Sequence, residues 1–294
     1  MRLRTAITVG AIAAAGLLVL SGCTDSSAPS GGNSPSATSE KVPYEAGTTM
    51  AKLADSGKIT IGTKFTQPLF GLNGPNGPEG FDIEIGKLIA AQLDIAPDKI
   101  TWVETVSANR EPFIQSGDVD LVIATYTIND ERKKVVSFAG PYYEAGQDIL
   151  VTAGNPEKIK GPEWFTDHPD KTVCTVSGST SLTNIKKYTS NILEAADYAD
   201  CLEPIRTGTA VALTTDNVIL AGLASQNEGE FEVLNKPFTQ EPYGIGLAHD
   251  DTAFRDWINS VLEQSYKDGS WDAAWESTAG TVLDLPKPPA VDRY

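Results

Sequence analysis

The sequence is short of positive charge, histidine and cysteine. Among its 294 residues are 23 Lys and Arg against 39 Asp and Glu, which gives a net charge of −16. Because phosphate binding requires clustered cations, this balance argues against nucleic acid as a partner. It also argues against adhesion to anionic lipid through charge alone. With only two histidines and three cysteines, the chain has few ligands for zinc, and we expect no metal site.

The common catalytic signatures are also missing. The sequence has no Ser-His-Asp order, no G-x-S-x-G, no H-E-x-x-H and no phosphate-binding loop. Its histidines, His168 and His249, fall in a predicted loop and at the end of a predicted strand. An enzyme would need a general acid or base near the reacting atom of its substrate. We therefore expect no catalytic residue, no cofactor and no enzymatic activity.

The first residues have the layout of a secretory signal peptide. "MRLR" carries two positive charges, an apolar run covers 5–20, and "LSGC" ends at Cys23. These last four residues resemble a bacterial lipobox, whose cysteine thiol accepts lipid. The alternatives are a plain secretory signal and an uncleaved membrane helix, although the run is short for a span of about 20 residues. We predict a lipoprotein signal peptide over 1–22 and a lipidated, palmitate-bearing Cys23 at the extracytoplasmic face of a bacterial cell membrane.

Export also guides the interpretation of the segments that follow. Residues 23–47 are rich in Ser, Gly and Pro and have no apolar period, which predicts a flexible tether between the lipid and the fold. Two cysteines remain in the chain, Cys174 and Cys201. Outside the cytoplasm an isolated pair indicates a disulfide.

From about residue 48 the pattern alternates between strands and helices. The alternation predicts an α/β architecture with parallel sheet. It runs once through the first half of the chain and then restarts, which indicates two lobes with a cleft between them. The expected strands cover 58–64, 100–105, 119–127, 147–153, 171–176, 210–215 and 242–249. The expected helices cover 81–94, 110–117, 129–137, 181–193, 216–225 and 251–269, and 71–80 is expected to be a loop.

One strand of this pattern ends in residues suited to an anion. "LVIATYTINDERKK" carries Thr125 and Thr127 on alternate positions and Arg132 five residues later. Hydroxyls, backbone donors and a guanidinium then meet at the end of a strand. Since a guanidinium presents a planar fork of donors, a carboxylate fits this arrangement.

Four segments together resemble a known family. They are "GFDIEIGKLIAAQL" (80–93), the run from "DLVIATYT" to "GQDILV" (120–151), "SGSTSLTN" (177–184) and "TTDNVILAG" (214–222). In this order they resemble family 3 extracytoplasmic solute-binding proteins, which serve ABC importers of polar amino acids. The resemblance runs from about 57 to 280. It implies a two-lobed periplasmic-binding-protein-like fold of type II, with the ligand cleft between lobes that two hinge strands join.

The resemblance also implies how the main chain of an amino acid is held. Arg132 would bind the α-carboxylate, with Thr125 and Thr127 donating from side chain or backbone. From the second lobe, Thr180 opens a helix, and a helix N-terminus offers free N–H groups and a positive dipole end. Asp216 matches the family's acid that receives the α-ammonium group.

Plainer interpretations of these residues stay open. The threonines could be ordinary strand residues, and Arg132 could form a surface ion pair with Asp130 or Glu131. Asp216 could be a simple helix N-cap. The chain also departs from the family at Val211, where an Asp is usual. That position is expected to affect the packing of a lobe rather than ligand binding.

The side-chain pocket is expected to decide which amino acid binds. In acidic-ligand members of the family, basic residues at the positions of Arg110 and Lys64 contact the distal carboxylate, and Ser107 lies beside them. Tyr198 matches a ligand-contacting tyrosine of an aspartate/glutamate binder. The resemblance therefore predicts L-glutamate, within a glutamate-binding lipoprotein subgroup, with aspartate or glutamine as rivals. The alternatives are a solvated Lys64 and an ion pair between Arg110 and Glu111.

The division into lobes follows from the repeated pattern. We place the first part of lobe 1 at 48–152, lobe 2 at 153–240 and the return to lobe 1, with C-terminal helices, at 241–294. The hinge strands are expected near Leu150–Ala153 and Gln240–Gly246. The predicted function is the monomeric binding component of an ABC importer, whose partners are an amino acid, permease subunits and the membrane. A ligand-sensing receptor domain and a cyclohexadienyl-dehydratase-like enzyme are the alternatives.

Overall fold

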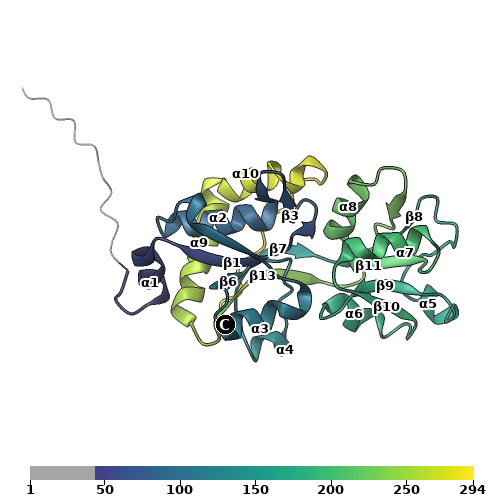
Figure 1. Cartoon of the computed structure of the whole chain (residues 1–294), viewed down its shortest axis with the longest axis horizontal. Coiled ribbons are helices and arrows are strands. Elements are labelled where there is room, and N and C mark those ends of the chain that lie inside the picture. Colours follow the sequence, from purple (N-terminus) through teal and green to yellow (C-terminus); the bar gives the residue numbers. More distant parts are fainter. Residues whose placement is uncertain (1–43) are drawn as a thin grey trace, which may run out of the picture. The chain divides into compact units, whose positions relative to one another are not determined.

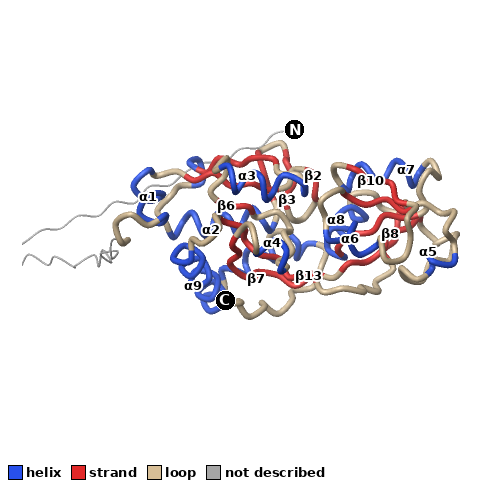
Figure 2. Tube along the Cα trace, turned by 90° about the horizontal axis from the view of Figure 1, so that it is seen from below, coloured by secondary structure: helices blue, strands red, loops and turns tan. Residues whose placement is uncertain are grey.

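Two five-stranded sheets organise the part of the chain that the structure describes. The computed structural model describes residues 44–294, which lie within one unit, so the predicted signal peptide, Cys23 and most of the tether fall outside it. Figure 2 shows the strands gathered in two separate groups. We call the first sheet and the helices against it lobe 1, and the second sheet with its helices lobe 2. No helix within 44–294 is long and apolar enough to cross a membrane.

The sheet of lobe 1 mixes parallel and antiparallel strands. Its strands are β1 (Ile59–Thr63), β5 (Ile100–Glu104), β6 (Leu121–Val122), β7 (Ser137–Ala145) and β13 (Glu241–Leu247). Their order is β5-β1-β6-β13-β7, so the strand that comes last in the sequence lies inside the sheet. β5, β1 and β6 are parallel, and β13 runs antiparallel to β6 and β7. The return of the chain into this sheet ties its two ends together.

Helices cover both faces of that sheet. They are α1 (Thr49–Ser56), α2 (Phe81–Gln92), α3 (Arg110–Ser116), α4 (Asp130–Lys133), α9 (Thr252–Asp268), α10 (Ser270–Glu276) and the 3₁₀ turns η1 (Pro97–Lys99), η2 (Ser107–Asn109) and η4 (Ala279–Thr281). Figure 1 shows α2 and α10 on one side of β1 and β6, and α3 and α4 on the other. Ile85, Ile89 and Leu93 recur at helical spacing and are fully buried. On α9, Phe254 and Ile258 are buried, whereas Ala253, which helical spacing places beside them, is exposed.

Lobe 2 repeats the layout with a smaller sheet. Its strands are β8 (Gln147–Thr152), β9 (Val173–Val176), β10 (Ile192–Ala195), β11 (Ala212–Asp216) and β12 (Phe231–Val233), in the order β10-β9-β11-β8-β12. Its helices are α5 (Trp164–Asp167), α6 (Thr180–Ile185), α7 (Leu202–Arg206), α8 (Asn217–Ser225) and the 3₁₀ turn η3 (Tyr198–Cys201). β10, β9 and β11 are parallel, and β8 is antiparallel to β11 and β12.

Some of the predicted elements differ from the structure. The expected loop over 71–80 is a hairpin of β3 (Gly71–Gly74) and β4 (Gly77–Glu79), joined to β2 (Thr66–Gln67), because Pro75 and Asn76 form a two-residue turn between the paired Gly74 and Gly77. The expected helix over 181–193 ends at Ile185, and its last residues begin β10. The Thr189 hydroxyl accepts from the backbone N–H of Asn191 at 3.0 Å, and such local bonds compete with a helix.

The chain crosses between the sheets earlier than expected. β8 pairs in the sheet of lobe 2, so the first crossing lies at Gly146 and not near Leu150–Ala153, as we had predicted. The second crossing approaches the first, since the backbone N–H of Phe238 donates to the Gln147 carbonyl at 2.9 Å. A Cβ on Gly146 would lie 2.8 Å from the Thr239 carbonyl oxygen, so only glycine fits between the two crossings.

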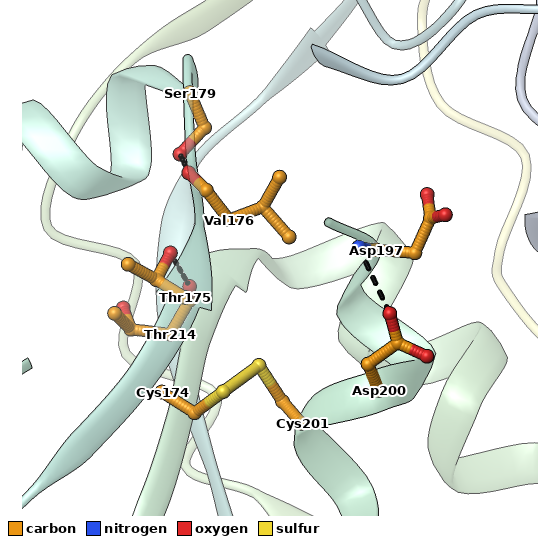
Figure 3. Close-up of a disulfide and its surroundings, with 8 residues drawn as sticks. All are labelled: Cys174, Thr175, Val176, Ser179, Asp197, Asp200, Cys201 and Thr214. Carbon is orange, nitrogen blue, oxygen red and sulfur yellow. Dashed lines mark hydrogen bonds between the residues drawn. A yellow bond between two sulfur atoms is a disulfide. The ribbon is translucent and has the colours of Figure 1, made fainter. Parts of the chain in front are cut away.

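The predicted disulfide is present in lobe 2. Cys174 on β9 is bonded to Cys201, and their Cα atoms are 5.6 Å apart (Figure 3). Cys201 ends η3, whose first turn is capped by reciprocal bonds between Asp197 and Asp200. The disulfide therefore fixes η3, and Tyr198 within it, against the sheet.

The last residues pack along the outer strand of lobe 1. The backbone N–H of Asp292 donates to the Gly140 carbonyl at 2.7 Å. The backbone N–H of Phe138 donates to the Tyr294 hydroxyl at 2.9 Å. The Tyr294 ring also lies 3.9 Å from the Lys133 ammonium. Residues 292–294 therefore cover the free edge of β7.

Candidate functional site

The strand that was expected to carry Thr125 and Thr127 ends before it reaches them. β6 ends at Val122, and Thr125 adopts a left-handed backbone with φ of 44°. The backbone N–H of Thr125 donates to the Asp82 carboxylate at 2.9 Å, which holds this turn. Thr127 regains extended pairing only as an isolated bridge to Tyr243. Both threonines are buried, but Thr125 lies on the turn and only Thr127 is extended, so the assignment of 119–127 to one strand was wrong.

Arg110 lies beneath this turn without an acidic partner. Its side chain is 3% exposed and donates to the carbonyls of Ser107, Ala124 and Thr125 at 3.2–3.4 Å. Its guanidinium stacks 4.3 Å from the centre of the Tyr126 ring. No carboxylate of residues 44–294 lies within 4.0 Å of it, so the alternative of an ion pair with Glu111 does not hold. A buried guanidinium that donates only to carbonyls can still form an ion pair with a carboxylate.

Arg132 uses Glu111 instead. Its Nε donates to Glu111 Oε1 at 3.1 Å, and its terminal nitrogens donate to the carbonyls of Thr127 at 2.7 Å and Gly178 at 3.2 Å. The Asn129 side chain caps α4 by accepting from the Arg132 N–H at 2.9 Å, as the sequence predicts. Burial, and then the nearby Arg110, lowers the pKa of Arg132 to about 10, so it remains a cation at neutral pH. The alternative of a surface pair with a neighbouring acid of its own helix does not hold.

Lys64 and Ser107 form the third cationic part of the site. Lys64 is 1% exposed, and its ammonium donates to Ser107 Oγ at 3.1 Å. Burial, and then the positive charge of Arg110, lowers the pKa of Lys64 to about 7. The alternative of a solvated Lys64 is therefore wrong. This amine can change its charge near neutral pH.

Lobe 2 supplies an acid and hydroxyls. Asp216 is 4% exposed and accepts from the Tyr243 hydroxyl at 2.7 Å, while its other oxygen, Oδ1, has no partner among the described residues. Asp216 occupies the N-cap position of α8, but its side chain makes no capping bond. Burial, and then the charge of Glu241, raises the pKa of Asp216 to about 7. Tyr198 is buried beside it, with its hydroxyl 3.5 Å from Ser181 Oγ.

The two lobes touch each other on both sides of these residues. On one side, the hydroxyls of Thr127 and Thr180 are 3.5 Å apart, and Arg132 reaches Gly178 of lobe 2. On the other side, a Cβ on Gly222 of α8 would lie 2.5 Å from the Pro68 carbonyl oxygen. The structure therefore describes the lobes in close contact, with the predicted residues at their interface.

A cavity of about 660 Å³ opens between the lobes. Three predicted residues border it, namely Thr127, Arg132 and Thr180, together with residues of α6 and the second crossing. The other predicted residues do not border this cavity, and each is at most 5% exposed. The structure thus brings the predicted residues to one interface. Only Thr127, Arg132 and Thr180, which are expected to hold the main chain of the ligand, lie beside the cavity.

Several residues of this interface were missed in the sequence. They are Gln67, Asp82, Glu111, Tyr126, Tyr243 and Glu241. In the sequence Asp82 is simply an acid at the start of a predicted helix, and its separation of 43 residues from Thr125 hides the contact. The described residues hold no group of three or more His, Cys, Asp or Glu suited to a metal. His168 stacks on Trp164, with ring centres 3.8 Å apart.

Several known proteins resemble this chain in sequence. Residues 59–278 match the model of the bacterial extracellular solute-binding proteins, family 3. An ABC transporter glutamine-binding protein from Bacillus subtilis is 40% identical over 232 residues, 78% of this chain and 83% of that protein. The glutamate-binding protein GluB from Corynebacterium efficiens is 39% identical over 241 residues, 77% of this chain and 80% of that protein.

The solved structures show the same fold. The solute receptor for L-cysteine of Neisseria gonorrhoeae aligns with a TM-score of 0.74 and 30% identity, covering 83% of this chain and 99% of that one. An ancestral arginine-binding protein bound to glutamine aligns with a TM-score of 0.69 and 34% identity, covering 76% of this chain and 97% of that one.

Proposed function

Because this chain belongs to family 3 of the bacterial extracellular solute-binding proteins, we propose that it binds L-glutamate for an ABC importer. The two curated relatives described above bind glutamine and glutamate. Glutamate would lie between the lobes and be delivered to the permease when they separate.

The main observation in favour of glutamate is the environment of the Arg110 side chain. It is buried, it donates only to carbonyls, and Lys64 is the second cation coupled to it. Burying a guanidinium and an ammonium close together is unfavourable unless an anion joins them, and the nearby Asp82 uses both of its oxygens for Thr125 and Tyr142. The distal carboxylate of glutamate supplies that anion.

The remaining residues would hold the part shared by all amino acids. Arg132, with Thr127 and Thr180, borders the open cavity and would bind the α-carboxylate. Asp216 has one oxygen without a partner, which would receive the α-ammonium group. This division assigns the distal group to Lys64 and Arg110.

Glutamine is the second candidate. A lysine whose pKa lies near 7 is partly neutral at physiological pH, and a neutral amine accepts a hydrogen bond from an amide. The glutamine-binding relative from Bacillus subtilis supports the same candidate. Aspartate remains the shorter acidic rival.

The test is calorimetric titration of the protein, from residue 24 onward, with each of the twenty amino acids. It is repeated with glutamate and glutamine on Arg132→Met and Arg110→Met. Losing one partner of a buried charge pair costs about 2–5 kcal/mol, or roughly 30-fold to several thousand-fold in affinity. Arg132→Met should weaken both ligands alike, and Arg110→Met should weaken glutamate far more than glutamine.

Arg206→Met is the matched control. Arg206 lies on the surface of lobe 2 in an ion pair with Glu230 at 2.7 Å, so its loss should leave both affinities unchanged. If Arg110→Met leaves glutamate affinity within about threefold, which is less than 1 kcal/mol, Arg110 does not hold a distal carboxylate, the argument for an acidic ligand fails, and the amino acid that binds the wild-type protein most tightly replaces glutamate.

We also propose that Cys23 carries the lipid that keeps the protein, as a monomer, on the extracytoplasmic membrane face beside its permease. Stable anchoring requires more than one acyl chain, which a lipidated N-terminal cysteine provides. Cys23→Ala should release the protein or leave its precursor unprocessed, as shown by cell fractionation and immunoblotting. Normal processing with full membrane retention would contradict the anchor.

A further inference from the structure

The backbone of Thr125 is strained in a way that its neighbours must oppose. A β-branched residue seldom adopts positive φ, yet Thr125 has φ of 44°. Its N–H donates to Asp82 at 2.9 Å, and its hydroxyl lies 3.0 Å from Gln67 Oε1. Strained residues of this kind cluster at ligand sites, where the surrounding structure maintains them.

Asp82 is the most constrained of these neighbours. It lies in the first turn of α2, is 0% exposed, and uses both carboxylate oxygens. Oδ2 accepts from Thr125 N–H, and Oδ1 accepts from the Tyr142 hydroxyl at 2.6 Å. The Tyr142 carbonyl in turn accepts from the indole N–H of the buried Trp271 at 3.0 Å. The carboxylate is therefore fixed from the core of lobe 1.

The same turn carries the acceptors of Arg110. Nη1 of Arg110 donates to the carbonyls of Ala124 at 3.2 Å and Thr125 at 3.4 Å. A rotation of the Thr125 backbone would move both carbonyls and leave the guanidinium without its support. The charges that act on Asp82 most strongly are those of Lys64 and Arg110, so the carboxylate also faces the cationic part of the site.

We propose that Asp82 is a positioning residue for ligand recognition. By accepting from Thr125 N–H it maintains the left-handed turn, and the turn places the Arg110 guanidinium for a distal carboxylate. Asp82 itself makes no contact with the ligand. This inference rests on the proposed function, since it concerns the site that binds the amino acid.

The proposal separates hydrogen-bond geometry from charge. In Asp82→Asn the amide oxygen still accepts from Thr125 N–H, and the amide nitrogen can donate to the Tyr142 hydroxyl, which is free to rotate. In Asp82→Ala both acceptors are lost. We expect Asp82→Ala to weaken glutamate binding by about tenfold and Asp82→Asn by less than about threefold. Glu84→Gln, a half-buried acid on the same helix that pairs with Lys87 instead of the turn, is the control and should not change affinity.

A double-mutant cycle tests whether Asp82 acts through the backbone of Thr125. Glycine adopts positive φ without strain, so Thr125→Gly removes the need for Asp82 while costing a hydroxyl. We expect Asp82→Ala to weaken binding about tenfold in the wild-type background and by less than twofold in the Thr125→Gly background. The Thr125 amide proton, followed by NMR, should shift in Asp82→Ala and stay near its original position in Asp82→Asn.

The outcomes are distinguishable from those of the proposed function. If the wild-type protein binds no amino acid, the proposed function fails and this inference fails with it. If glutamate binds but Asp82→Ala is harmless, or Asp82→Asn is as damaging as Asp82→Ala, only the positioning role is overturned. Should Asp82→Ala not fold, Tyr142→Phe loosens the carboxylate instead, and we expect about threefold weaker binding together with a shifted Thr125 amide. An unchanged affinity and amide in that variant would equally overturn the role.

Discussion

The two lobes bring opposite charge to one interface. Every buried cationic side chain of the described residues belongs to lobe 1, namely Lys64, Arg110 and Arg132 at the site and Arg255 beside Tyr294, although lobe 1 also buries the acids Asp82 and Glu241. In lobe 2 the buried charged side chains are the acids Asp148 and Asp216. Neither surface is neutralised by itself, because Arg110 has no carboxylate beside it and one oxygen of Asp216 has no partner among residues 44–294.

The difference bears on how an acidic protein would bind the proposed ligand, glutamate. The net charge of −16 is spread over the molecule, where solvent and salt screen it. At the interface, burial removes that screening, so a few cations decide the local field. A ligand whose carboxylates bind lobe 1 and whose ammonium group binds lobe 2 would hold the lobes together. A ligand that lacks either charge would bind with lower affinity.

The largest expected effect comes from removing the acid of lobe 2. Asp216→Asn should weaken every amino acid that carries an α-ammonium group, because the ammonium then loses its buried partner. The expected loss is about 2–5 kcal/mol, or roughly 30-fold to several thousand-fold. Titration with glutamate and glutamine measures it.

Asp148→Asn provides the comparison for that variant. Asp148 is also buried in lobe 2, but it accepts from the backbone N–H groups of Ile149 and Lys236, away from the interface residues. We expect it to lower stability and leave both affinities unchanged. Equal losses of affinity in the two variants would mean that Asp216 does not contact the ammonium group.

The next expected effect is a difference in stability between the two lobes. The disulfide belongs to lobe 2 and closes a loop with a sequence separation of 27 residues. Removing it in Cys174→Ser/Cys201→Ser should cost about 2–4 kcal/mol by freeing the unfolded chain. Urea denaturation measures the loss, and hydrogen exchange should show it in lobe 2 and not in lobe 1. Equal loss of protection in both lobes would show that they unfold as one cooperative unit.

The pH dependence of binding should report one titrating group from each lobe, Asp216 and Lys64. The pKa of Asp216 is about 7 in the ligand-free site, and the ligand ammonium favours its ionised form. Affinity should therefore rise as pH increases toward 7. The pKa of Lys64 is also about 7, and a distal carboxylate favours its protonated form, so glutamate affinity should fall as pH increases above 7. Each limb can reach about tenfold per pH unit for one linked proton.

Glutamine separates the two limbs. A neutral amide does not favour a protonated lysine, so its affinity should rise toward pH 7 and then level off. Titrations between pH 5 and 8.5 in one buffer system at constant ionic strength measure both curves. A falling limb for glutamine as steep as that for glutamate would remove Lys64 from the distal-group assignment.

The smallest expected effect concerns the contact between the lobes. Gly222→Ala adds a Cβ that would lie 2.5 Å from the Pro68 carbonyl oxygen, so the lobes cannot approach as closely. In the middle of α8, however, alanine stabilises a helix by about 1 kcal/mol relative to glycine. We expect glutamate affinity to fall about threefold while the melting temperature of the ligand-free protein stays level or rises. A parallel fall in both would indicate damage to lobe 2 rather than to closure.

Sequence patterns predicted the features that depend on residues close together in the chain. The capping of α4 by Asn129, the burial of Ile85 and Ile89 on α2, and the alternation of strands and helices all follow from local spacing. The pairing of Cys174 with Cys201 followed from their number and from export. These features need no knowledge of distant contacts.

Contacts between distant segments were beyond those patterns. The left-handed turn at Thr125 depends on Asp82, 43 residues earlier, so a strand over 119–127 was the natural prediction. Glu111 replaces the nearer acids as the partner of Arg132 for the same reason. The first crossing was displaced because β8 finds its partners in β11 and β12, which come much later in the sequence.

The packing of residues 292–294 on β7 has a consequence for how copies of the protein meet one another. β7 is the outermost strand of its sheet, and an open strand edge is a template on which another chain can add a strand. Here the Phe138 N–H and the Gly140 carbonyl are already bonded to Tyr294 and Asp292. The aromatic ring of Tyr294 also lies between two cations, Lys133 and Arg255. This part of the edge is thus protected against strand addition, so that β7 resists the edge-to-edge association that leads to aggregation.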